Sequence, residues 1–348
     1  MSSIYDREKY RPIVDLNEQA VPPGKLPDIY FIVLDSYTSN YLLETEFHYN
    51  NADLYSFLRT NNFYVMDSSV SNYYFSPVSI SSTFNLDYLP KASDSKDKNE
   101  MVLLSGLKLL SQSNLLSFLS KKGYVFYNFS PFSIDTTASQ LNSHYNGTTD
   151  TDLLQLNTIE NIDYETILSN FLRQIKGSKK ISVEEKNIEN KSKDLQIFSN
   201  FIFKHSKTSG LNPSLIYIHA LWPHPPYVFD STGSRLDIKF RKDTSYYGFV
   251  QQTAYMNRFI KEWVTSLRTN KPDAIIILQG DHGFRYFDES KNRRHAFDIL
   301  NAVYLPNQKY KPFYATISSV NTFRLILNSY FGQSLPILKD TSYYLFKE

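Results

Sequence analysis

Short apolar runs alternate along the chain with stretches in which apolar residues recur at helical spacing. The runs are rich in β-branched and aromatic residues, which is typical of strands buried on both faces of a parallel sheet. The first of them reads Ile-Tyr-Phe-Ile-Val-Leu. Six such runs predict strands, at residues 29–34, 63–66, 124–127, 214–218, 274–278 and 299–305.

The segments between these runs predict helices. Residues 51–59 have helical spacing with an Asn near the start, residues 115–122 are followed by Gly123, and residues 251–267 separate two of the apolar runs. Strands that alternate with helices form βαβ units, in which helices cover a parallel sheet. The predicted fold class is therefore α/β, a doubly wound, mostly parallel sheet with helices on both faces.

Two segments depart from this alternation. Residues 1–27 contain four prolines among mixed charges, which disfavours a helix and predicts an extended leader. Residues 135–205 are rich in Asn, Thr, Lys, Ser and Glu, with helical stretches near 164–175 and 183–203. We interpret them as a polar helical insertion in a single domain of residues 28–348, and favour a solvated excursion over a lid.

Charge and composition exclude several classes of protein. The 348 residues carry 37 basic and 35 acidic side chains, a net charge of +2, so no nucleic-acid partner is expected. No cysteine is present, which excludes disulfide scaffolds and thiolate zinc sites. No apolar run reaches the ~20 residues of a membrane span. No signal peptide is visible, so either the protein is cytoplasmic or a targeting or anchoring part lies outside this sequence.

Polar residues with metal-binding chemistry follow three of the predicted strands. Ligands of open α/β sheets bind beyond the carboxyl ends of the strands. His219 and His224 follow the strand at 214–218. Asp35 ends the first strand, and the adjacent pair Asp281 and His282 follows the strand at 274–278 between two glycines. Carboxylate and imidazole together form a mixed O/N ligand set that suits zinc or manganese better than magnesium or calcium. The sequence therefore predicts one divalent cation held by these three residues.

A hydroxyl nucleophile and an anion-binding histidine would complete such a site. Residues 76–83 offer five hydroxyl side chains, and composition alone does not select one. His224 stands among prolines that stiffen the backbone, and it is a candidate for binding an oxyanion or protonating a leaving group. We interpret His219 as a satisfied core histidine. Trp222 could line a pocket or fill the core, with core the default.

At these residues the chain resembles the alkaline phosphatase superfamily, in particular its sulfatase-like branch, which includes lipoteichoic acid synthases and phosphoethanolamine transferases. The segments Asp28-Ile-Tyr-Phe-Ile-Val-Leu-Asp35 and Asp281-His282-Gly283 are similar to the family's ligand segments, and Ser79-Ile-Ser-Ser82 to its nucleophile helix. His224-Pro-Pro-Tyr resembles its substrate-side histidine. The resemblance implies that Asp35, Ser79, Asp281 and His282 hold the cation, with Ser79 as nucleophile and Ser76 as the alternative.

The departures from the family pattern refine this expectation. Neither Ser76 nor Ser79 stands in the C/S-x-P-x-R context that formylglycine formation requires, which argues against sulfate-ester hydrolysis. A second acidic ligand is replaced by Ser36, and His295 is the one further candidate ligand, so a single metal is favoured. Arg285 follows the Asp-His-Gly turn as a candidate anion clamp, and with Trp222 it forms the predicted substrate-binding pair.

The resemblance implies a metal-dependent phosphotransferase or phosphoester hydrolase with catalytic residues Ser79 and His224. The expected partner is a small molecule, lipid or glycan that bears a phosphoester. Membrane anchoring through a missing N-terminal segment and an extracytoplasmic location are expected from the same branch. The alternatives are a sulfatase or phosphonate hydrolase of the superfamily, or a catalytically silent binding module.

Overall fold

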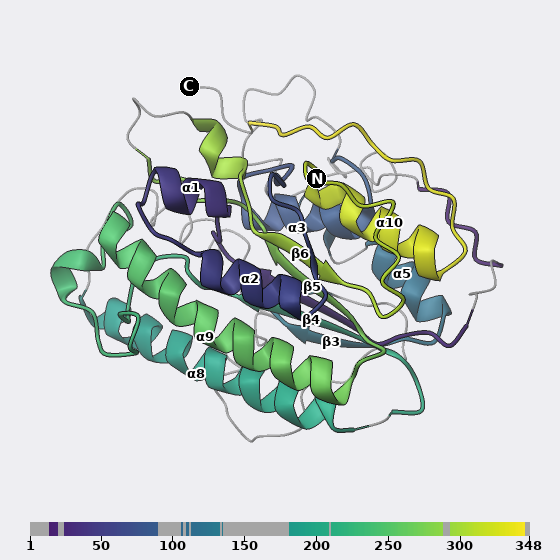
Figure 1. The fold of residues 1–348 in the computed structure, drawn as a ribbon, viewed down its shortest axis with the longest axis horizontal. Helices are drawn as coiled ribbons and strands as arrows, with labels where there is room; N and C mark the ends of the chain where they lie inside the picture. Colours follow the sequence, from purple (N-terminus) through teal and green to yellow (C-terminus); the bar gives the residue numbers. More distant parts are fainter. Residues whose placement is uncertain are drawn as a thin grey trace, which may run out of the picture.

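A single six-stranded sheet forms the centre of the computed structural model (Figure 1). The structure describes residues 14–19, 24–89, 106, 109–110, 113–132, 134, 181–208, 210–287 and 293–344. The strands are β1 (Ile29–Leu34), β2 (Tyr64–Val65), β3 (Val125–Phe129), β4 (Ser214–Ala220), β5 (Ile275–Gly280) and β6 (Asn301–Tyr304). Their order is β2-β6-β5-β1-β4-β3. The pairs among β5, β1, β4 and β3 are parallel, whereas β6 is antiparallel to both β5 and β2.

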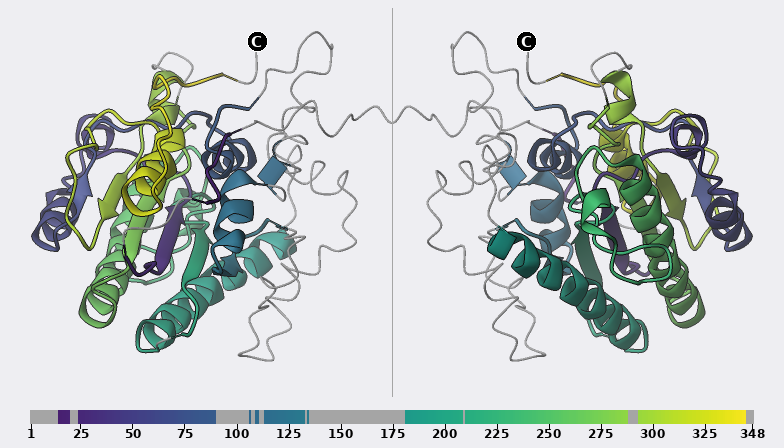
Figure 2. Two further views of the ribbon diagram at one scale, coloured as in Figure 1. Left: turned by 90° about the vertical axis from the view of Figure 1, so that its right-hand side faces the viewer. Right: turned by 90° about the vertical axis from the view of Figure 1, so that its left-hand side faces the viewer.

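Helices cover both faces of the sheet (Figure 2). The helices are α1 (Asn40–Thr45), α2 (Ala52–Thr60), α3 (Ser76–Asn85), α5 (Asn114–Lys121), α8 (Ile181–Ser206), α9 (Tyr246–Asn270) and α10 (Ser319–Tyr330), with short 3-10 turns at Ile238–Phe240 and Arg293–Phe297. Alternate residues of β1 enter opposite cores. Tyr30, Ile32 and Leu34 pack with α2, α8 and α9, while Phe31 and Val33 pack with α3, α5 and α10. The predicted α/β fold, a mostly parallel sheet with helices on both faces, is confirmed.

The predicted strands and the helices at 51–59, 115–122 and 251–267 are present within a few residues of their expected limits. Gly123 has a φ of 82°, as expected for a residue that ends a helix in the left-handed region. The predicted helix near 164–175 lies outside the described residues. The division into a leader, a domain and an insertion stays a prediction.

Helix α8 corrects the expectation of a solvated excursion over residues 135–205. Leu195, Phe198 and Ile202 are almost completely buried against the sheet and α9. Trp263 of α9 donates a hydrogen bond from Nε1 to Ser199 Oγ at 2.8 Å. The part of the segment that the structure describes is therefore a component of the core. Its polar composition concealed this role, although among residues 191–206 only Lys193, Gln196, Asn200 and Lys204 are exposed.

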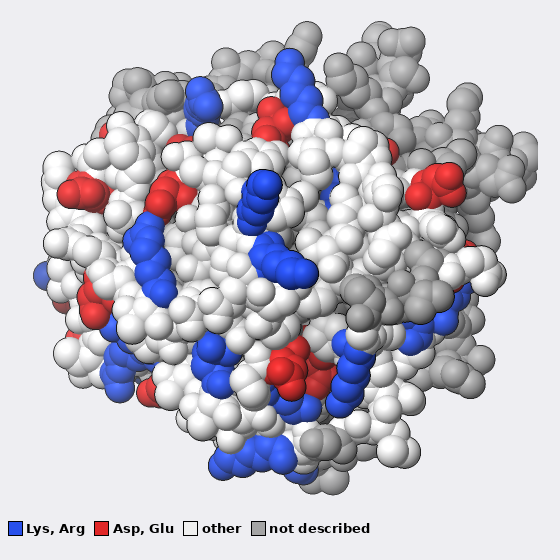
Figure 3. All heavy atoms as spheres, turned by 45° about the vertical axis from the view of Figure 1, so that its right-hand side comes forward, with Lys and Arg blue, Asp and Glu red and all other residues white. Residues whose placement is uncertain are grey.

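On the face drawn in Figure 3, basic and acidic side chains are interspersed among uncharged ones. Among the described residues, no helix has the length and apolar composition that crossing a membrane requires.

A buried polar triangle joins the loop after β1 to two helices. Tyr37 Oη donates to Asn257 Oδ1 at 2.6 Å, Asn257 Nδ2 donates to Asn51 Oδ1 at 2.7 Å, and Asn51 Nδ2 donates to Tyr37 Oη at 2.9 Å. Each member thus satisfies the next in a ring. Because Tyr37 lies two residues after Asp35, the triangle also fixes the chain at the carboxyl end of the central strand.

Replacing Asn257 with alanine should leave Tyr37 and Asn51 with unpaired buried groups. We expect Asn257→Ala to lower the free energy of unfolding by about 1–3 kcal/mol in urea denaturation. Thr265→Ala, at an exposed position of the same helix, is the control and should change it by less than about 0.5 kcal/mol. Equal effects of the two substitutions would contradict a structural role for the triangle.

Candidate metal centre

Three adjacent strands deliver polar side chains to one point at their carboxyl ends. In β1, which lies between β4 and β5, Leu34 pairs with Ala220 on one side and Gly280 on the other. Asp35 directly follows β1, and Asp281 directly follows β5. The parallel register therefore places these side chains at the same level of the sheet, where ligands of such folds bind.

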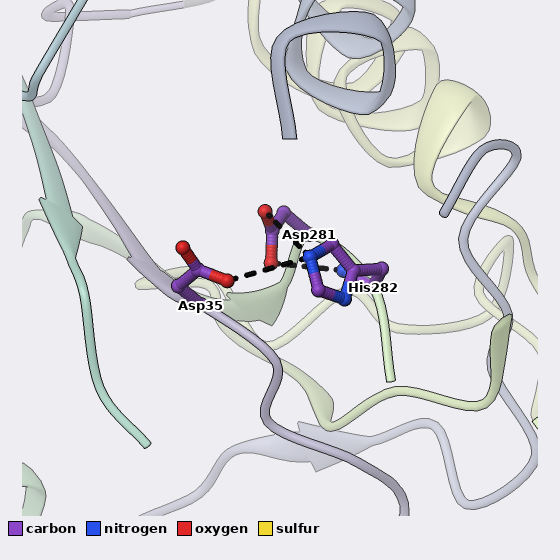
Figure 4. A group of neighbouring side chains, drawn as sticks. All are labelled: Asp35, Asp281 and His282. Carbon is purple, nitrogen blue, oxygen red and sulfur yellow. Dashed lines mark hydrogen bonds and ion pairs between the residues drawn. The ribbon is translucent and has the colours of Figure 1, made fainter. Parts of the chain in front are cut away.

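The predicted ligands Asp35, Asp281 and His282 lie together. Figure 4 shows their side chains pointing toward one another, and one ligand atom of each lies within 4.8 Å of the others. Exposures of 3%, 1% and 0% place all three out of contact with bulk water. Gly283 makes the turn possible, since a Cβ at that position would collide with the carbonyls of Asp298 and His295.

The hydrogen bonds of this group leave lone pairs directed at one another. His282 Nδ1 lies 2.8 Å from the carbonyl of Gly283, which can only accept, so Nδ1 carries the proton and Nε2 a lone pair. This Nε2 lies 3.4 Å from Asp35 Oδ1 and 3.7 Å from Asp281 Oδ2. Nε2 and Asp281 Oδ2 are buried without a hydrogen-bond partner. Lone pairs converge without a proton between them, as they do around a cation.

His219, interpreted from the sequence as a satisfied core histidine, belongs to the same group. Its Nε2 is buried without a hydrogen-bond partner and lies 3.6 Å from Asp35 Oδ2 and 3.7 Å from Asp281 Oδ2. Its Nδ1 lies 2.9 Å from the hydroxyl of Tyr217. That interpretation is therefore wrong. The sequence already places His219 at the end of a predicted strand, and the pairing of that strand with β1 is what brings it to the group.

The spacing fits a small cation with mixed oxygen and nitrogen ligands. A tetrahedral zinc site with bonds of about 2.0–2.1 Å holds its ligand atoms about 3.3–3.4 Å apart. The imidazole-to-carboxylate distances here are 3.4–3.7 Å. Asp35, Asp281, His282 and His219 could thus hold one zinc or manganese ion after small adjustments.

The surroundings of these residues favour the protonation states that bind a cation. Burial lowers the pKa of His282, against the charge of Asp281, so the imidazole stays neutral. Burial alone would raise the pKa of Asp35, but interactions with His224, His219 and His282 lower it well below its ordinary range. The main-chain N–H groups of Ser36 and His282 donate to Asp281 Oδ1 at 3.2 and 2.9 Å. Anionic carboxylates and neutral imidazoles are the forms that bind metal.

Helix α3 places the Ser79 hydroxyl next to this group. Ser79 is 1% exposed, and its Oγ donates to the main-chain carbonyl of Asp281 at 2.6 Å. Ser76 is the first residue of the helix and is half-buried. The helix begins beside Arg285, whose guanidinium donates to the carbonyl of Tyr74 at 3.0 Å and lies 4.9 Å from the ring centre of Phe75.

Arg285 and His224 form a pair on the same side of the site. Nδ1 of His224 lies 2.7 Å from the carbonyl of Pro225, which makes it the protonated nitrogen, and Nε2 then accepts from Arg285 Nη2 at 3.2 Å. Burial lowers the pKa of His224 to about 3. The predicted proton donor therefore has no proton at Nε2 in this structure. A neutral imidazole in this position orients the guanidinium.

Trp222, a candidate for substrate binding, and His295, a candidate metal ligand, make other contacts. Trp222 is fully buried, stacked 6.0 Å from the ring of Phe229, so it fills the core, as its default interpretation had it, and offers no surface to a substrate. Nδ1 of His295 pairs with Asp298 Oδ2 at 3.2 Å. In the described part of the chain, His295 has no ion pair with Asp35 or Asp281.

Solved structures share this architecture across nearly the whole chain. The C-terminal periplasmic domain of EcEptC from Escherichia coli, in a complex with Zn, is 12% identical with a TM-score of 0.53, and the match covers 93% of this chain and 92% of that one. A putative sulfatase from Bacteroides thetaiotaomicron is 10% identical with a TM-score of 0.53, over 92% of this chain and 74% of that one. The chain has the alkaline phosphatase and sulfatase-like fold. The predicted resemblance is thus confirmed for the fold.

A further sulfatase-like structure, the putative sulfatase yidJ from Bacteroides fragilis, is 13% identical with a TM-score of 0.52, over 89% of this chain and 75% of that one. Scans against protein-family models and the curated proteins gave no match. At identities of 10–13%, the likeness concerns the fold of this sulfatase-like chain and not its reaction.

Metal binding to the four-residue group is directly testable. We expect zinc to raise the melting temperature of the parent protein, since a ligand at 100 times its Kd stabilises the folded state by about 2.7 kcal/mol. Asp281→Asn and His219→Ala should remove most of this shift, because each deletes a converging ligand. Asp273→Asn, at an exposed position, should keep it. An identical zinc response in all four proteins would contradict the assignment.

Proposed function

We propose that this protein is a metal-dependent phosphotransferase or phosphoester hydrolase with a serine nucleophile. The observation that carries the proposal is the grouping of Asp35, Asp281 and His282, whose ligand atoms lie within 4.8 Å of one another, with His219 Nε2 3.6 and 3.7 Å from the two carboxylates. Ser79 of α3 contacts this group. A divalent cation held there would lower the pKa of a hydroxyl and neutralise the charge of a phosphoryl group. Zinc or manganese is proposed from the ligand set, and the zinc complex of the similar domain supports zinc.

The burial of Ser79 and the hydrogen bond of its hydroxyl favour Ser76 as the attacking group. The Ser79 hydroxyl is nearly inaccessible and donates its proton to the carbonyl of Asp281, so its evident role is to fix α3 to the metal-binding turn. Ser76 is more exposed and stands at the N-terminus of α3, where the positive end of the helix dipole favours a developing negative charge. Attack would join Ser76 Oγ to phosphorus and release the alcohol of the ester.

Arg285 is the proposed clamp for the phosphoryl oxygens, oriented by neutral His224. The phosphoester is proposed to come from a lipid or a glycan, and the pocket walls decide whether water or a second alcohol receives the group. The periplasmic origin of the similar EcEptC domain supports an extracytoplasmic location. Unmodified serine chemistry is favoured over sulfate hydrolysis because the chain lacks cysteine and the C/S-x-P-x-R context.

A covalent phosphoserine tests the proposal. The protein, loaded with zinc or manganese, would be incubated with chromogenic phosphate, phosphonate and sulfate esters, quenched in acid and examined by intact mass. We expect a phosphate adduct that disappears in Ser76→Ala, because its attacking oxygen is gone. Ser79→Ala should reduce the adduct without abolishing it.

Ser81→Ala, on the same helix, is the matched control and should form the adduct normally. Loss of the adduct in Ser79→Ala alone would make Ser79 the nucleophile, as the sequence predicted. Absence of both adduct and turnover with every ester would overturn the proposed function.

A further inference from the structure

The loop that carries His224 has few hydrogen-bond donors of its own. Prolines at 223, 225 and 226 lack an N–H group, so the loop cannot satisfy its carbonyls internally. Its main-chain link to the metal centre is the N–H of His224, which donates to the carbonyl of Asp35 at 3.0 Å. The loop carbonyls therefore need donors from other elements.

Two side chains from different helices supply these donors. Gln252 of α9, fully buried, donates from Nε2 to the carbonyls of Pro223 and His224 at 3.1 and 3.0 Å, and accepts from the N–H of Val228 at 2.6 Å. Lys191 of α8 approaches from the other helix. Its Nζ donates to the carbonyl of His224 and lies 3.4 Å from that of Pro226.

Lys191 is an unusual residue to find in this place. It is 5% exposed, and its ammonium lies 5.3 Å from the ring centre of Trp222. Burial lowers its pKa to about 7, a cost that a lysine avoids where it can extend into water. A contact maintained at such a cost points to a role for the contacted loop.

We propose that Lys191 is a positioning residue that fixes His224, and through His224 the guanidinium of Arg285. The path consists of three hydrogen bonds at one residue: Lys191 donates to the His224 carbonyl, His224 Nδ1 donates to the carbonyl of Pro225, and His224 Nε2 accepts from Arg285. The hydrogen bonds are present in the structure whatever the protein does. Only their consequence for anion binding rests on the proposed function.

Selective ¹⁵N labelling of the histidines tests the path without any substrate. The parent protein should show His224 with a protonated Nδ1 and an unprotonated Nε2, assigned by loss of the signal in His224→Gln. Lys191→Met should shift both ¹⁵N signals toward values averaged over the two tautomers, because the ring is no longer held against Arg285. Lys204→Met, an exposed lysine of the same helix, should leave them unchanged.

Unchanged His224 signals in a folded Lys191→Met protein would overturn the inference. If Lys191→Met does not fold, Lys191→Gln, which keeps one donor, serves for the same comparison with a smaller expected shift. A titration of the zinc-loaded protein with inorganic phosphate separates the two proposals. We expect Lys191→Met to weaken phosphate binding about tenfold. A parent that does not bind phosphate would count against the proposed function, while the nitrogen signals still decide on Lys191.

Discussion

The rest of the structure depends on a buried cluster of two carboxylates and two imidazoles at the carboxyl ends of the central strands. Asp35 and Asp281 are buried with His219 and His282, and the imidazole nitrogens face carboxylate oxygens with no proton assigned between them. Such an arrangement is costly in an empty protein, because like charges and lone pairs repel in a low-dielectric site. A single divalent cation held between these groups would turn this repulsion into attraction.

The rest of the fold serves to bring these groups together. The parallel register of β4, β1 and β5 sets the level of three of the four ligands, and the ring of Tyr37, Asn51 and Asn257 fixes the loop beyond β1. Ser79 ties α3 to the turn that carries Asp281 and His282. The metal centre, the serine helix and the arginine are thus connected through the backbone of residues 281–285.

Much of the fold could be predicted because the strands are continuous apolar runs between turns, a signal that does not depend on distant contacts. The direction of β6 was not encoded in that signal, since apolar patterning is the same for either orientation. Helix α10 was missed because four of its first six residues, Ser319, Asn321, Thr322 and Arg324, are polar, and their burial is not visible in the sequence. Asp35, Asp281 and His282 were found because each directly follows a strand. His219 lies within one, where a ligand and a core residue look alike.

One cation is expected between Asp35, Asp281, His282 and His219. Anomalous diffraction from crystals grown with zinc, recorded on both sides of its absorption edge, tests this most directly. The account predicts one strong peak about 2.0–2.2 Å from carboxylate oxygens and imidazole nitrogens of these residues. No peak at this point, with the imidazoles turned to donate hydrogen bonds to the carboxylates, would contradict it.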